Sequence, residues 1–237
     1  MLRTRPHTPG LLPKRSASKR QSRGFSIVEM LVGVAIGLFV LSSAILIFVG
    51  NITNSRYVLL QTRIDQDLRS TMDLITRDLR RGAYWVNFLT GTTTSSSSAT
   101  SNPYSTVTIS GTAAAPEIDF SYANSTDDTN ITSRTFGFRL NSTTNAMQMN
   151  IGSANWQTLT DTNIASVTAF TITPTVTTID ISASCSKTCT GSTCPSVTVR
   201  TYNIVLSATS KVDSAVSRTL RSQVRVRNEA MAGSCPT

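Results

Sequence analysis

The chain has 237 residues, enough for one domain with a sizeable core and additional segments. Charged residues make up only 15% of it, a composition that favours an extracytoplasmic β-rich domain over a cytosolic enzyme. The net charge of +9 is concentrated near the N-terminus, because seven of the 22 basic residues and no acidic one lie in the first 24 positions. The remaining 15 basic and 13 acidic residues nearly balance, which argues against a nucleic-acid-binding surface.

The N-terminal segment predicts a membrane topology. Residues 1–24 are rich in Pro, Ser and Arg and lack apolar periodicity, so we expect a disordered cytoplasmic leader. The 20 residues from Met30 to Val49 carry no charge, and a helix of that length spans a bilayer core of about 30 Å. Basic residues precede this run and Arg56 is the first to follow it, so the N-terminus should face the cytoplasm. Residues 25–49 are therefore predicted to form a transmembrane helix.

The helical pattern continues beyond the membrane, over residues 50–82. Apolar side chains recur there at steps of three or four residues, which defines one face of an α-helix: Leu60, Ile64, Leu68, Met72, Ile75 and Leu79. Asp65 with Arg69, and Asp73 with Arg77, have the spacing of ion pairs along a helix. We expect one helix from Phe25 to about Arg81, ended by Gly82, whose amphipathic second half needs a partner surface.

The sequence of residues 83–237 predicts a β-rich domain that supplies this partner surface. A Ser/Thr-rich loop occupies residues 90–102, and short runs of alternating apolar and polar residues follow it. The apolar members are Ile118, Phe120 and Tyr122; Phe136, Phe138 and Leu140; Met147, Met149 and Ile151; Tyr202, Ile204, Leu206 and Ala208; and Leu220, Val224 and Val226. A longer run covers residues 165–176. This period of two predicts an antiparallel sheet with one face covered by the helix, so the fold class is α+β.

One motif lies directly before the apolar run, Arg23-Gly24-Phe25-Ser-Ile-Val-Glu29. It resembles the prepilin signal of type IV pilins and related pseudopilins. The resemblance implies that a membrane peptidase cuts between Gly24 and Phe25 and that the new N-terminal Phe25 is methylated. The apolar stretch is kept, whereas a secretory signal is cut after its apolar region. The resemblance also implies the pilin fold, with a long N-terminal helix on an antiparallel sheet.

Glu29 is the other assembly residue of this motif. A carboxylate near the end of an apolar helix costs a few kcal/mol in lipid unless it is paired. Once residues 1–24 are removed, no basic residue of the same helix reaches it. The free amine of Phe25 on a neighbouring subunit is a natural partner, so the pair would set the register of insertion.

Two further stretches, residues 72–84 and 220–228, resemble PilW-type minor pilins. This resemblance implies a subunit that waits in the inner membrane and then joins the pilus at the cell surface, near the tip, where it primes assembly. Adhesion, twitching motility and DNA uptake would be indirect consequences. The implied partners are the prepilin peptidase and methyltransferase, the assembly platform, the other minor pilins and the major pilin, and a tip adhesin. Two alternatives remain open: a J-like minor pseudopilin of type II secretion, and a competence pilin that holds DNA with the face carrying Arg221.

The cysteines are all in the last quarter of the chain, at Cys185, Cys189, Cys194 and Cys235. Their spacing lacks paired C-x2-C knuckles, so we favour two disulfides over a zinc site, with one bridge inside the cluster and one to Cys235. Which cysteines pair stays open. The sole histidine, His7, lies in the predicted leader, which excludes Ser-His-Asp and Cys-His catalysis from the mature chain. We therefore expect no enzyme, no cofactor and no metal.

Overall fold

A computed structural model describes residues 24–88, 102–123, 135–191 and 193–236. The leader up to residue 23 and nearly all of the Ser/Thr-rich loop 90–102 lie outside these ranges. The chain divides into a unit that ends at Ile52 and a unit that begins at Thr53, and one helix, α1 (Ile27–Arg81), continues from the first into the second.

The first unit consists of the beginning of α1. Its described residues are all exposed, although most of them are apolar. The helix is long and apolar enough to cross a membrane. An apolar surface that surrounds a helix completely needs lipid or other helices around it.

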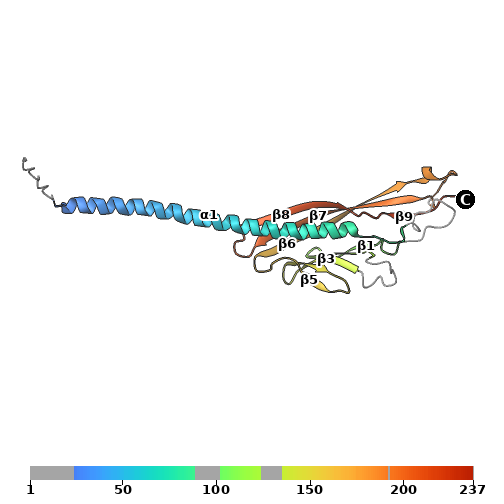
Figure 1. Cartoon of the computed structure of the whole chain (residues 1–237), viewed down its shortest axis with the longest axis horizontal. Helices are drawn as coiled ribbons and strands as arrows, with labels where there is room; N and C mark the ends of the chain where they lie inside the picture. Colours follow the sequence, from blue (N-terminus) through green and yellow to red (C-terminus); the bar gives the residue numbers. More distant parts are fainter. Residues whose placement is uncertain (1–23, 89–101, 124–134, 192, 237) are drawn as a thin grey trace, which may run out of the picture. The chain divides into compact units, whose positions relative to one another are not determined.

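The second half of α1 belongs to the unit that begins at Thr53, and it has one buried face. The buried apolar residues are those of the predicted stripe, from Ile64 to Leu79, while Leu60 is half-buried. Thr71 and Asp78 are also buried on this face, which the apolar pattern did not predict. Figure 1 shows this part of α1 running alongside the strands.

The end of the helix differs from the prediction. The helix ends at Arg81 as expected, but the left-handed residue that turns the chain is Ala83, at φ 62°, and not Gly82. Gly82 is required for a different reason, because a Cβ there would lie 3.0 Å from the carbonyl oxygen of Leu79. The backbone N–H of Ala83 then donates to Ser121, which joins the end of the helix to the first sheet.

The strands form two antiparallel sheets, where the sequence predicted one. The first sheet is a meander in chain order, formed by β1 (Val107–Thr112), β2 (Ala115–Ser121), β3 (Thr135–Asn141), β4 (Ala146–Asn150) and β5 (Trp156–Thr158). Its core face carries the predicted alternating residues, among them Phe120, Phe138 and Met147. Ile151 is an exception, because it lies beyond the end of β4 and is 49% exposed.

The second sheet is built on a long hairpin. β6 (Ala165–Asp180) pairs with β7 (Ser196–Ser210), β7 pairs with β8 (Ser217–Arg225), and the short β9 (Ala230–Ala232) pairs with the beginning of β7. A short 3-10 helix, η3 (Ser182–Ser184), follows β6. Tyr202, Ile204 and Leu206 of β7 face a core that also contains the buried stripe of α1 and the inner face of the first sheet. The two sheets and the helix thus share one core.

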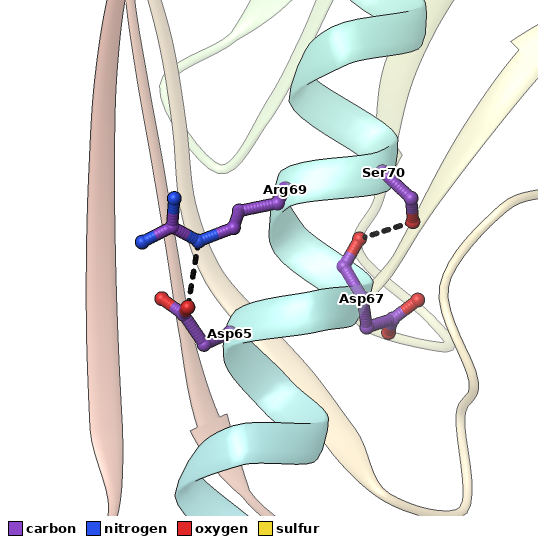
Figure 2. A network of polar contacts seen from close by, with 4 residues as sticks. All are labelled: Asp65, Asp67, Arg69 and Ser70. Atoms are coloured by element: carbon purple, nitrogen blue, oxygen red, sulfur yellow. Dashed lines mark hydrogen bonds and ion pairs between the residues drawn. The ribbon is translucent and has the colours of Figure 1, made fainter.

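Polar contacts form along α1 and between α1 and the loop before β6. Figure 2 shows two of those within the helix, Arg69 with Asp65 and Ser70 with Asp67. The predicted ion pair between Arg69 and Asp65 is present, with 2.6 Å between Nε and Oδ2. Asp67 accepts a hydrogen bond from the backbone N–H of Asp161, which precedes β6, over 3.2 Å, and partial burial raises the pKa of the Asp67 carboxyl. Arg77 lies 3.5 Å from Asp78, the neighbouring acid, and not at the predicted Asp73.

Candidate functional site

The predicted cleavage site lies at the beginning of α1. Gly24 and Phe25 precede the helix, and no atom lies within 4 Å of the position that a Cβ of Gly24 would take. The Phe25 side chain is 85% exposed. The first helical hydrogen bond joins the N–H of Met30 to the carbonyl oxygen of Ser26 over 3.1 Å. The Gly24–Phe25 bond therefore lies outside the helix, in backbone that a peptidase can reach.

Glu29 lies in the first turn of α1 and is exposed. An acidic residue there interacts favourably with the partial positive charge of the helix N-terminus. Glu29 follows Phe25 by four residues, one helical turn, and has no ion-pair partner within 4.0 Å among the described residues. Its carboxylate is exposed to the surroundings of the helix.

The surface beyond Glu29 is largely apolar from Met30 to Val49, more than five helical turns. Large apolar side chains between Phe25 and Leu59 are 40–85% exposed, and they surround the helix on all sides. Gly33 and Gly37 interrupt this surface, since no other atom lies near the positions of their absent side chains. Small residues at that spacing let a second helix approach closely. An exposed apolar surface of this kind suits a membrane.

Comparison with protein families decides the relationship. A family model described as prepilin peptidase-dependent protein B matches residues 57–226, and one described as the prokaryotic N-terminal methylation motif matches residues 19–45. The chain belongs to the prepilin peptidase-dependent protein B family. No curated protein and no solved structure gives a significant match.

This prepilin-like protein is processed by prepilin peptidase, and its family is one of pilin-like structural proteins and not of enzymes. The methylation motif and the apolar start of α1 indicate anchoring in the inner membrane before assembly. The two matches fall on different units of the chain. The methylation motif covers the exposed beginning of α1, and the larger family covers most of the unit that begins at Thr53.

The prepilin contains two disulfides, as the cysteine content predicts. Cys185 is bonded to Cys235 and Cys189 to Cys194. All four sulfurs are therefore bonded and none is a free thiolate for a metal. The first bridge joins the end of the β6–β7 hairpin to the C-terminal segment, and the second closes a small loop within the hairpin connection.

The C-terminal segment of the prepilin adds a strand that the sequence analysis missed. β9 pairs with β7 over three residues, from Ser196↔Ala232 to Thr198↔Ala230. Gly233 follows at φ 80°, and a Cβ there would lie 2.3 Å from the carbonyl oxygen of Cys194. A glycine just before the last cysteine was the available signal, because close backbone approach is a common reason for glycine at such a position.

The structure also brings together arginines that are far apart in the sequence. Arg80 and Arg81 lie in the last turn of α1, where cations complement the helix dipole, and Arg225 and Arg227 lie at and just beyond the end of β8. The backbone N–H of Arg227 donates to the carbonyl oxygen of Arg80 over 3.1 Å, so the two groups meet at the end of α1. Arg221 lies earlier on β8, on the same face as Arg225, and is also exposed.

Proposed function

We propose that this protein is a minor pilin of the type IV pilus, of the PilW type, that primes pilus assembly and stays at or near the tip. The observation that carries the proposal is the helix α1, whose exposed apolar part begins at a prepilin motif and whose second part holds a folded domain. Such a subunit can leave the membrane only by exchanging lipid contacts for contacts with other helices of the same kind. Adhesion, twitching motility and DNA uptake then depend on it through the pilus.

The proposed mechanism begins with cleavage between Gly24 and Phe25 and methylation of the Phe25 amine by the prepilin peptidase. The assembly platform then moves the subunit into the base of the growing bundle. Glu29 neutralises the Phe25 amine of a neighbouring subunit, which removes the penalty of a few kcal/mol for an unpaired charge in apolar surroundings. Because the charge pair forms at only one stagger of adjacent helices, it also selects the register.

The proposed partners meet the protein through α1. They are the other minor pilins and the major pilin, whose helices would cover the apolar surface from Phe25 onward. A tip adhesin would meet the β-rich unit and not the helix. The Cys185–Cys235 disulfide is consistent with a β-rich unit outside the cytoplasm, where such bridges persist.

A clean in-frame deletion in the source cell tests the function. Surface pili in sheared fractions and secreted proteins in the medium are measured side by side, with the gene supplied in trans as the control. Loss of pili with normal secretion is the expected result. Normal pili with lost secretion would assign the protein to the J-like minor pseudopilins of type II secretion, with the same fold and processing.

The role of Glu29 has its own test. Glu29→Val should be inserted in the inner membrane and cleaved to a mature chain that begins at Phe25, yet be absent from sheared pili. Glu29→Asp, which keeps the charge, is the matched control and should be incorporated at least in part. Incorporation of Glu29→Val into pili at the normal level would contradict the charge-pairing mechanism. A mature chain that begins at a residue other than Phe25 would contradict the proposed cleavage site.

A further inference from the structure

Four arginines surround the C-terminal end of α1, and we call them the arginine cluster: Arg80, Arg81, Arg225 and Arg227. All four are exposed. Two surface hollows lie among them, one of about 250 Å³ lined by Arg80, Arg225 and Arg227, and one of about 320 Å³ lined by Arg81, Arg227 and Tyr84. Arg227 lines both hollows.

The guanidinium groups of the cluster are not needed to cap the helix. Basic side chains in a last turn often satisfy free carbonyl groups there. Here the backbone N–H groups of Arg227 and Tyr84 donate to the carbonyl oxygens of Arg80 and Arg81, each over 3.1 Å. The last turn is thus closed by main-chain contacts, and the side chains can bind something else.

Two acids accompany the cluster and neutralise part of it. Glu229 is paired with Arg225. Asp78 is buried, and its Oδ1 lies 3.5 Å from Arg77 and 4.0 Å from Arg81. The guanidinium of Arg81 also lies 4.5 Å from the centre of the Tyr122 ring, which holds that side chain in place.

The positive charges of Arg80 and Arg227 are not neutralised in this way. Neither has an acidic partner within 4.0 Å among the residues that the structure describes. Among the residues that the structure describes, Arg77 and the four arginines of the cluster are accompanied by two carboxylates, Asp78 and Glu229, which leaves an excess of three positive charges. This excess occurs in a chain whose remainder beyond residue 24 is nearly neutral.

We propose that the arginine cluster is a docking surface for an acidic segment of a partner protein, whose Asp or Glu side chains enter the two hollows. A guanidinium group binds a carboxylate through two parallel hydrogen bonds, and arginines line both hollows. The exposed ring of Tyr84 offers apolar contact at the rim. This inference is independent of whether the partner system is a pilus or a secretion pseudopilus.

A protein partner fits this surface better than duplex DNA. DNA presents a line of phosphates and is held by an extended basic track. The arginine cluster is instead confined to the end of one helix, and Glu229 lies within the hollow that Arg80 and Arg227 line. A carboxylate there repels a dense row of phosphates more than it repels one or two spaced acidic side chains.

The test compares two double variants of the full-length protein in detergent micelles. Arg80→Gln/Arg227→Gln removes the unpaired arginines of the cluster. Arg63→Gln/Arg221→Gln is the matched control, because Arg63 is exposed on the same helix as Arg80, Arg221 is exposed on β8, the strand that ends two residues before Arg227, and the net charge changes equally. Binding of a fluorescent deca-glutamate peptide is measured by anisotropy at low ionic strength, with a deca-serine peptide and a short mixed-sequence duplex DNA in parallel.

The wild type and the control double variant should bind the glutamate peptide with similar affinity, and the cluster variant should bind it about tenfold or more weakly. Equal weakening in both double variants would overturn the proposal, since it would show only general charge attraction. Tighter binding of duplex DNA, lost in the cluster variant, would overturn it in favour of a nucleic-acid partner.

Discussion

The stability contributed by each disulfide follows from which cysteines are paired. A bridge restricts the unfolded chain more when it closes a longer loop. Cys185 and Cys235 are separated by 50 residues and Cys189 and Cys194 by 5. The chain-entropy relation gives about 4 kcal/mol for the long loop and about 2 kcal/mol for the short one.

We therefore expect Cys185→Ala/Cys235→Ala to lower the free energy of unfolding by about twice as much as Cys189→Ala/Cys194→Ala. The assay is urea unfolding of the full-length protein in micelles, followed by tryptophan fluorescence. Its two tryptophans, Trp85 and Trp156, both belong to the unit that begins at Thr53, so the signal reports that unit. An equal loss in the two variants, or a greater loss for the short loop, would refute the reasoning.

A tryptic digest without reducing agent tests the pairing directly. Trypsin cuts after Lys187 and Arg227, so Cys185, the Cys189 and Cys194 pair, and Cys235 fall in three different peptides. With the pairing of the structure, the peptides of Cys185 and Cys235 are joined to each other and the middle peptide carries an internal bridge. Either other pairing would join all three peptides, which would contradict the structure and the magnitudes above.

Ile75→Ala should lower the free energy of unfolding in urea by about 3 kcal/mol, because Ile75 is fully buried between α1 and the sheets. The control is Ile52→Ala on the same helix. Its side chain is 40% exposed, so the free energy of unfolding should change by about 0.5 kcal/mol or less. Ala154→Gly should raise the thermal midpoint, because Ala154 has a φ of 57° in the β4–β5 turn, while Ala114→Gly, in the β1–β2 turn with an ordinary φ, should leave it unchanged or lower it. Burial, then the Glu117 charge, raises the pKa of Asp119 from 3.8 to about 6. The folded state therefore binds this proton more tightly than the unfolded chain, so the free energy of unfolding should rise as pH falls from about 7 towards 4. After allowance for solvent screening, the rise should be about 1 kcal/mol. Urea titrations at each pH measure it, and Asp119→Asn should remove it.

The local periodicities of the sequence were sufficient to predict most of the elements. In α1 the residues that pack together are neighbours three or four positions apart, so the buried stripe around Leu68 and Ile75 can be read from the sequence. The alternation in β7 is equally local, and Tyr202, Ile204 and Leu206 are buried as expected. The prediction failed where a pattern ran past its element, as at Ile151, because a period does not show where backbone pairing ends.

The sequence also determined that the protein has a prepilin motif, since Gly24, Phe25 and Glu29 are adjacent in the chain and need no tertiary contact to be recognised. For the cysteines it determined less. Any pairing of the four would join Cys235 to the cluster near the β6–β7 connection, so the expectation of such a bridge could not distinguish the three possibilities. The choice of Cys185 depends on where β9 and Gly233 place the C-terminal segment, which is a property of the folded sheet.

What the sequence by itself determined is therefore the helix, its division into an exposed apolar part and an amphipathic part, the β-rich character of the rest, and the motif that begins it. Only the tertiary structure decided that the strands form two sheets, that Cys185 pairs with Cys235, and that Arg227 lies against Arg80. The physical reason is range. Helical stripes and strand alternation arise between near neighbours, whereas these three features join residues many positions apart, and their contacts form only when the whole core is assembled around α1.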